Sequence, residues 1–323
     1  MRYTYYRNGL CVLILSFFTF LAIGELIIRL YSRKHTIYDI EMTRYANLLK
    51  VDSPNPNIGH LQRPNSFAKL MKVDIKINSD GFRDQEYPIQ KKSGKRRIIF
   101  LGDSITFGWG VEKESTYEYL IESELNNQNP TEIINLGSGN YNTVQEVNLF
   151  IDKGLKYNPD EVVLFYFIND AETVPEKSVL QIVSRSQLFT FFWSRFKLIE
   201  HRLGITPNYI FYYKDLYSDG KPGWRDAQNA FLLLKEVCVK NNIALKVITL
   251  PDLHELKDYP FIGEHMLLKN FLDEHSILNI DLTNQFVDLE NSKLLWVASD
   301  DTHPNTLGHK LIAQYSLPFI SKN

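Results

Sequence analysis

The segment 161–168 reads Glu-Val-Val-Leu-Phe-Tyr-Phe-Ile and constrains the fold of this chain more than any other stretch. A run that is apolar at both odd and even positions is buried on both faces when it forms a β-strand. Strands of that kind are typical of the centre of a parallel sheet. Asn158-Pro159 ends the preceding helical pattern, and Asn169-Asp170 follows the run. The chain is therefore expected to build a parallel β-sheet around this segment.

Four further short apolar runs alternate with helical patterns along the chain. The predicted strands are residues 97–101, 132–136, 243–250 and 277–282. Helices with one apolar face are expected between them, and Ser115–Glu118 and Thr143–Glu146 have the spacing of capping boxes. A regular alternation of strands and helices indicates an α/β domain with a parallel sheet of five strands.

Composition excludes several classes of protein. The 323 residues are 44% hydrophobic and 23% charged, which indicates an ordered globular chain. The net charge of −2 provides no basic field for a phosphate backbone, so nucleic acid is not an expected partner. Two cysteines, Cys11 and Cys238, cannot form a disulfide framework. The histidines contain no pair at metal-ligand spacing, so neither a metal nor a cofactor is expected.

Residues 9–30 are apolar except for Glu25 and Arg29. About 20 such residues cross the hydrocarbon core of a bilayer, so this segment is expected to be a single-pass membrane helix. A cleaved signal peptide is an alternative, because basic residues precede the run and Ala22-Ile23-Gly24 offers small residues for cleavage. A buried core helix is a second alternative. The apolar run continues past the cleavage site to Leu30, which favours an uncleaved anchor. The basic residues on its two sides do not determine its orientation.

Three regions are expected along the chain. Residues 1–34 form the anchor, residues 35–95 a juxtamembrane connector with a short hairpin, and residues 96–323 the α/β domain. Within this domain, residues 171–223 are too long for an ordinary connection and are rich in aromatic side chains. This insertion is either a lid over the substrate, or a helical insertion that packs on the domain or touches the membrane.

Polar side chains follow three of the predicted strands. Ser104 comes directly after the first strand, Asn140 follows the second and Asn169 the third. The carboxyl ends of parallel strands meet at one edge of the sheet, where open α/β sheets bind ligands. The Ser104 hydroxyl is therefore a candidate nucleophile.

Near the end of the chain, Asp300 and His303 are three residues apart. One turn of helix can present both side chains to the same side, where the carboxylate would orient the imidazole as a general base. The alternative is a helix N-cap beside a surface histidine. With Ser104, the two residues would supply a nucleophile, a base and an orienting group.

Four motifs in this order resemble the GDSL or SGNH hydrolases over residues 97–315. They are Gly102-Asp103-Ser104 after the first strand, a Gly/Asn turn after the second, Asn169-Asp170 after the third, and Asp300-x-x-His303-Pro304-Asn305 near the end. The stretch Asn78-Ser79-Asp80-Gly81-Phe82-Arg83 and the apolar N-terminal segment look like a membrane-anchored bacterial branch of that family.

The resemblance implies a flavodoxin-like three-layer α/β/α sandwich and a metal-free triad of Ser104, Asp300 and His303. It also implies an oxyanion hole made by the Ser104 N–H, an N–H of the second motif and the Asn169 side chain. The position usually held by the oxyanion glycine is Asn140 here, directly after Gly139. Asparagine tolerates positive φ, so either of these two residues could supply the N–H.

The expected function is that of a membrane-anchored serine esterase whose catalytic domain lies outside the cytoplasmic membrane. Its substrate would be an acyl ester, for example an acetyl ester, on a glycan or a lipid. An O-acyltransferase that acts on an envelope polysaccharide with the same triad is an alternative. A non-catalytic envelope scaffold is a second alternative. The acyl group, the acceptor and the oligomeric state do not follow from the sequence.

Overall fold

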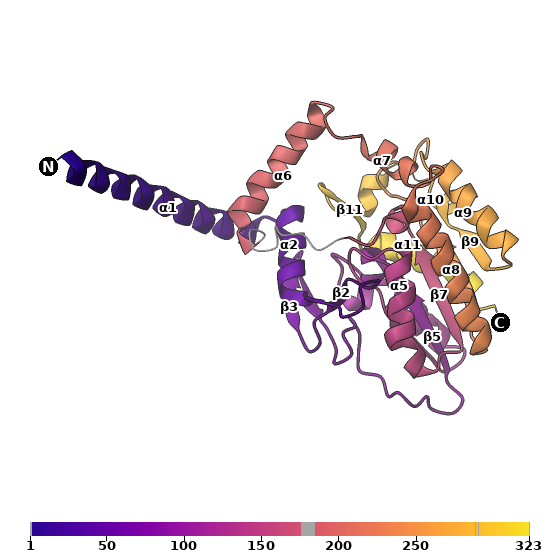
Figure 1. Cartoon of the computed structure of the whole chain (residues 1–323). Helices are drawn as coiled ribbons and strands as arrows, with labels where there is room; N and C mark the ends of the chain where they lie inside the picture. Colours follow the sequence, from indigo (N-terminus) through magenta and orange to yellow (C-terminus); the bar gives the residue numbers. More distant parts are fainter. Residues whose placement is uncertain (1, 176–184, 288, 290, 323) are drawn as a thin grey trace. The chain divides into compact units, whose positions relative to one another are not determined.

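The computed structural model describes residues 2–175, 185–287, 289 and 291–322 (Figure 1). The chain divides into two compact units. The N-terminal unit comprises the described residues of Met1–Asn47 and Ser178–Thr206, and the sheet unit those of Leu48–Lys177 and Pro207–Asn323. Much of the predicted connector thus groups with the sheet, and part of the predicted insertion groups with the N-terminal helices.

The sheet unit is built on five parallel strands in the order β6-β5-β7-β8-β9. The strands are β5 (Arg96–Leu101), β6 (Thr131–Asn135), β7 (Glu161–Tyr166), β8 (Ala244–Thr249) and β9 (Leu278–Asp281). The predicted five-stranded sheet is confirmed, and β7, which is buried at every position, lies at its centre. In this doubly wound order, β6 is added on one side of β5 and β7 on the other. Sheets of this kind form a ligand crevice at the point where the strand order reverses, here between β5 and β7.

Burial of the strands explains why these residues form a sheet. Every residue of β6 and β7 is buried. Phe100 of β5 and Phe165 of β7 pack with ring centroids 4.8 Å apart, and Tyr117 contacts Phe165 at 4.5 Å. Each such aromatic side chain contributes roughly 1.5–3 kcal/mol by leaving water. The core therefore holds the carboxyl ends of β5 and β7 in a fixed position.

Helices cover both faces of the sheet. Helices α4 (Tyr117–Asn126) and α11 (Thr306–Ile320) pack together, as do α5 (Thr143–Leu149) and α8 (Pro222–Lys240). Helix α9 (Ile262–Glu274) joins α8 through Phe231 and Phe271. The result is the three-layer architecture expected from the sequence. The predicted capping boxes are each wrong by one residue: Thr116 caps α4, and Asn142 with Gln145 forms the box of α5.

Three antiparallel hairpins accompany the main sheet. They pair β1 (Lys50–Asp52) with β2 (His60–Gln62), β3 (Phe67–Leu70) with β4 (Val73–Lys76), and β10 (Trp296–Ala298) with β11 (Asp301–Pro304). The register of the third hairpin shifts, because Trp296 pairs with Pro304 but Ala298 pairs with Asp301. Strand β11 thus contains one more residue than β10 between these two pairs.

Shorter helices complete the sheet unit. They are α3 (Ser104–Phe107), α7 (Tyr209–Leu216), α10 (Thr283–Phe286) and the single turns η1 (Lys113–Ser115), η2 (Phe150–Gly154), η3 (Leu155–Tyr157), η4 (Ile168–Ala171) and η6 (Ser292–Leu295). Helix α3 directly follows β5, and η4 directly follows β7.

The N-terminal unit contains α1 (Arg2–Lys34), most of α2 (Tyr38–Leu49) and α6 (Gln187–Arg202) (Figure 1). Among the described residues, only the part of α1 from Gly9 to Lys34 is long and apolar enough to cross a membrane. None of the residues in its most apolar stretch is buried against the rest of the protein. That exposure does not fit a core helix. The same length and composition would also suit a signal sequence.

Candidate active site

Ser104 begins helix α3 at the carboxyl end of β5. The side chain of Asp103 caps this short helix by accepting a hydrogen bond from the Ile105 N–H at 2.8 Å. The Ser104 Oγ lies 2.8 Å from His303 Nε2 and 3.2 Å from Asp103 Oδ2. The predicted nucleophile and base are thus within hydrogen-bond distance, although 199 positions separate them in the sequence.

A glycine brings the turn after β6 against this helix. A Cβ atom at Gly137 would lie 2.4 Å from the backbone nitrogen of Phe107 in α3. No side chain fits at that distance, so glycine is needed for the close approach of the two backbones. The turn of residues 137–141 therefore lies directly beside α3, the helix that begins with Ser104.

His303 lies on β11, and its two ring nitrogens have different partners. Nδ1 is 2.5 Å from Asp301 Oδ1. A carboxylate only accepts, so Nδ1 carries the proton and Nε2 is free to accept from the Ser104 hydroxyl. The ring therefore has the tautomer that a general base requires.

The carboxylate beside His303 belongs to Asp301, not to the predicted Asp300. The prediction assumed a helical turn, but the chain is extended from Asp301 to Pro304. In an extended chain, residues two positions apart project to the same side. Asp300 lies in the turn before β11 and is exposed, whereas the Asp301 side chain is 1% exposed. The expected pairing of Asp300 with His303 is therefore wrong by one residue.

Trp109 holds the second oxygen of this carboxylate, and nothing in the sequence singled it out. Its indole Nε1–H donates to Asp301 Oδ2 at 2.8 Å, while the backbone N–H of His303 donates to Oδ1 at 3.1 Å. Both oxygens of Asp301 are thus engaged. The carboxylate is fixed in the orientation that meets the imidazole.

The carboxylate of Asp301 makes the His303 imidazole a stronger base. Burial alone would lower the pKa of His303, but the hydrogen bond and negative charge of Asp301 outweigh it, so this pKa is raised above its ordinary value. Burial would raise the pKa of Asp301, yet its hydrogen bond to His303 lowers it. Asp301 therefore stays ionised and stabilises the proton that His303 would accept.

The candidate oxyanion residues lie on the two loops that follow β6 and β7. Asn140 has a φ of 65°, the left-handed conformation expected for the position usually held by glycine. Asn169, on η4, donates from its side chain to the Asp103 carboxylate, which itself contacts Ser104. Within the described part of the chain, the buried Asn169 Oδ1 has no hydrogen-bond partner. The structure thus brings Asn169 into the neighbourhood of Ser104.

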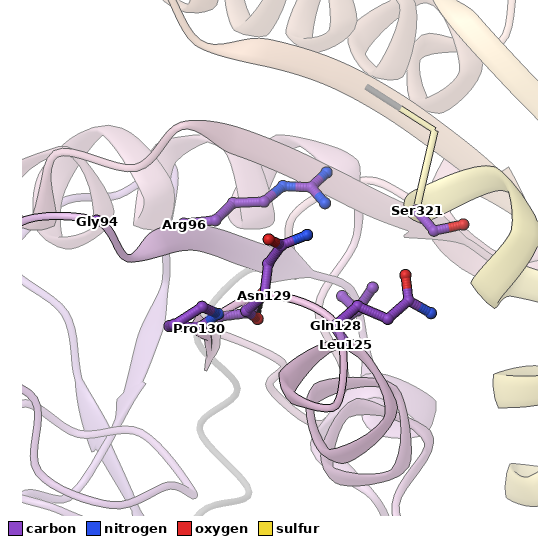
Figure 2. Close-up of a pocket in the computed structure, with 8 residues that line it drawn as sticks. Gly94, Arg96, Leu125, Gln128, Asn129, Pro130 and Ser321 are labelled. Carbon is purple, nitrogen blue, oxygen red and sulfur yellow. Dashed lines mark hydrogen bonds between the residues drawn. The ribbon is translucent and has the colours of Figure 1, made fainter.

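Neither a metal cluster nor the hollow at the other end of the sheet forms a competing site among the described residues. In the described ranges, no group of three or more His, Cys, Asp or Glu side chains could hold a metal ion. Figure 2 shows a hollow of about 300 Å³ where β5 and β6 begin, lined by residues that include Arg96, Gln128 and Asn129. Arg96 is paired with Glu161 and the Ile320 carbonyl. Its two hydroxyl groups, those of Thr131 and Ser321, donate to backbone carbonyls, and the hollow lies at the opposite end of the strands from Ser104.

Solved structures with a similar architecture include a lipolytic protein of the G-D-S-L family and two esterases. One is a G-D-S-L family protein from Desulfitobacterium hafniense, with 16% identity, 69% of this chain and 98% of that chain covered, and a TM-score of 0.44. Another is an acetylxylan esterase from Geobacillus stearothermophilus, with 15% identity, 72% and 98% covered, and a TM-score of 0.47. A two-domain esterase active on acetylated mannans has 18% identity, 71% and 50% covered, and a TM-score of 0.46.

No protein-family model matches the sequence, and no curated protein matches it either.

Proposed function

We propose that this protein is a serine esterase with Ser104 as nucleophile, His303 as general base and Asp301 as the group that orients the base. The observation that carries the proposal is the chain of contacts from Ser104 Oγ to His303 Nε2 at 2.8 Å and from His303 Nδ1 to Asp301 Oδ1 at 2.5 Å. A nucleophile, a base and an orienter in this order are the signature of nucleophilic acyl transfer.

The proposed reaction has two steps. Ser104 Oγ attacks the ester carbonyl carbon while His303 Nε2 takes its proton, and the bond to the alcohol oxygen then breaks as His303 returns that proton to it. A water molecule, deprotonated by His303, next attacks the carbonyl carbon of the acyl-Ser104. The bond from that carbon to Ser104 Oγ then breaks, His303 returns the proton to Oγ, and the carboxylic acid leaves. In both steps negative charge develops on the carbonyl oxygen, and we assign its stabilisation to the Ser104 N–H, an N–H of the Gly139-Asn140 pair and the Asn169 side chain.

The substrate class proposed is an acyl ester, for example an acetyl ester, on a glycan or a lipid outside the cytoplasmic membrane. Helix α1 is proposed to remain attached as a single-pass anchor. Two contacts within the N-terminal unit support its retention. Gly24 lies close enough to Leu188 that an added Cβ would be 3.1 Å from that side chain, and Glu25 accepts hydrogen bonds from the first residues of α6. Removal of α1 would leave α6 without these partners.

The test is a substrate panel on the full-length protein in detergent micelles. The panel contains p-nitrophenyl acetate, longer acyl esters and acetylated polysaccharides, each with and without an added sugar acceptor. Hydrolysis of short esters alone indicates an acetylesterase, and turnover that depends on the acceptor indicates the transferase. A protein inert towards every ester and towards a fluorophosphonate probe contradicts the proposal and leaves the non-catalytic scaffold.

The pH dependence of turnover follows from the raised pKa of His303. The base must be neutral to act, so activity is lost as the pH falls through its pKa in the folded protein. Because this pKa is raised, the acid limb of kcat/KM is expected above the ordinary histidine value of about 6.5. Asp301→Asn should move the limb to lower pH, since the main group that raises the pKa is gone. A rate profile with p-nitrophenyl acetate checks both, and a limb that is the same in the two proteins contradicts the assignment.

A further inference from the structure

The β1–β2 hairpin contacts every residue from Ser138 to Tyr141, the turn that carries the candidate oxyanion N–H. Gln62 donates to Ser138 Oγ at 3.1 Å, and Lys50 donates to Asn140 Oδ1 at 2.9 Å. Tyr141 donates its hydroxyl to the His60 carbonyl at 2.5 Å. The ring of His60 also packs edge-on against Tyr141, with centroids 4.9 Å apart. A segment about 80 residues away in the sequence thus holds this turn on several sides.

The contact between His60 and Gly139 fixes a backbone peptide rather than a side chain. His60 Nε2 lies 3.1 Å from the Gly139 carbonyl oxygen. A carbonyl only accepts, so Nε2 must carry a proton. Burial, aided by the charge of Lys50, lowers the pKa of His60 to about 3. His60 is therefore a neutral donor across the physiological range of pH.

Fixing this carbonyl also fixes the N–H of the next residue. The Gly139 C=O and the Asn140 N–H belong to one planar peptide unit, and the described chain contains no cis peptide bonds. In a trans peptide the two groups point in opposite directions. With the carbonyl held by His60, the Asn140 N–H points away from His60.

We propose that His60 is a positioning residue that aims the Asn140 N–H at the oxyanion, and hence that Asn140 rather than Gly139 is the donor from this turn. The inference rests on the proposed esterase function. Both residues lie in the sheet unit, so the argument does not depend on the N-terminal helices. His60 itself is not expected to touch the substrate.

The test compares His60→Ala with His60→Gln in the full-length protein. Loss of one oxyanion donor costs about 10² to 10³ in rate, so mispositioning it in His60→Ala should lower kcat by roughly 10-fold to 10²-fold with KM nearly unchanged. His60→Gln keeps an N–H donor and should recover most of the rate. Melting temperatures of all three proteins show whether the hairpin is still folded.

The outcomes separate this inference from the proposed function. An active wild type with unchanged kcat in His60→Ala, or with equal losses in the two variants, overturns the role of His60 alone. A wild type inert to esters and to the fluorophosphonate probe overturns the esterase proposal and the role of His60 with it.

A second and independent observation concerns α6, whose apolar face is turned outward. Large apolar side chains recur at helical spacing at Leu188, Phe192, Phe196, Ile199 and Leu203. Phe192 is 63% exposed, Phe196 50% and Leu203 70%. Soluble surfaces rarely expose a continuous apolar stripe of this kind without a partner.

Cationic side chains flank the stripe. The Arg195 guanidinium lies 4.9 Å from the centre of the Phe191 ring, and the Lys197 ammonium lies 5.1 Å from that of Trp193. A helix with one apolar aromatic face bordered by Lys, Arg and Trp is typical of helices that lie in the plane of a membrane interface.

Helix α6 begins beside Glu25, the first charged residue in the apolar segment of α1. Glu25 of α1 accepts from Ser186 Oγ at 2.7 Å and from the Leu188 N–H at 2.9 Å, and it pairs with Arg29 at 2.7 Å. Polar residues of a membrane-spanning helix are favoured near the interface, so α6 begins at that level. We infer that the apolar stripe of α6 lies in the headgroup region of the same bilayer that α1 crosses, with anionic lipids as its charge partners.

Spin labels test this inference, which rests on the proposed anchor. The full-length protein, with Cys11→Ser, is reconstituted into vesicles of phosphatidylethanolamine and phosphatidylglycerol. Labels are placed on the apolar face at Phe196→Cys, on the polar face at His201→Cys, and in α1 at Leu13→Cys. The label at position 196 is expected to be accessible to oxygen and shielded from a water-soluble nickel complex. The label at position 201 is expected to be accessible to the nickel complex and less accessible to oxygen.

The three labels separate the placement of α6 from the anchor role of α1. Equal exposure of positions 196 and 201 to nickel, with position 13 shielded, overturns the interfacial helix and keeps the anchor. Exposure of position 13 to nickel overturns the anchor and, with it, this placement of α6.

Discussion

The variant Ser104→Ala is expected to lower kcat by about 10⁶ and to abolish labelling by a fluorophosphonate, because it removes the only atom that forms the acyl-enzyme. The Ser104 side chain is small and buried beside His303, so its replacement by alanine should leave the fold intact. Turnover of p-nitrophenyl acetate, probe labelling and the melting temperature are the measurements.

Ser123→Ala is the matched control. Ser123 is exposed on α4 and should tolerate the same change without loss of rate or labelling. Wild-type activity in Ser104→Ala would show that another group performs the chemistry.

The second large effect separates two neighbouring aspartates. Asp301→Asn is expected to lower kcat by about 10⁴, since the amide no longer holds the Nδ1–H tautomer or stabilises the imidazolium. Asp300→Asn makes the same chemical change one residue away, on an exposed side chain, and should leave kcat near that of the wild type. Parallel rate measurements on the two variants compare the residue found beside His303 with the one that the sequence predicted.

A large loss in Asp300→Asn with a small one in Asp301→Asn would contradict the geometry described above. Equal losses would point to a general disturbance of the hairpin, which the melting temperatures would reveal.

The fold could be predicted because its signals are local. Segment 161–168 is apolar at both odd and even positions after Glu161 because β7 is covered on both faces, and the other four strands are short apolar runs between amphipathic helices. Ser104, at the end of such a strand, could be placed at the ligand edge for the same reason. The predictions that were wrong concern single residues. The capping box of α5 was predicted to begin at Thr143 but begins at Asn142, and both residue types are good helix caps.

The site was less predictable because most of its contacts join distant segments. Asp300 and Asp301 are adjacent and chemically identical, and choosing between them requires knowing that the chain is extended at His303. Trp109 and His60 act through partners 192 and 79 residues away, so no local pattern marks them. The outward-facing stripe of α6 could be recognised as aromatic, but its attachment to Glu25 could not.

The irregular pairing of β10 with β11 makes the length of this hairpin a condition for the proposed catalysis. The extra residue in β11 falls in the segment that contains His303. Bulges of this kind redirect a side chain out of the regular alternation and are common beside active sites. A deletion of Thr302 would restore regular pairing and turn His303 away from Asp301, although every catalytic side chain would still be present. Homologues of this chain should therefore tolerate substitution at position 302 far better than a change in the number of residues there.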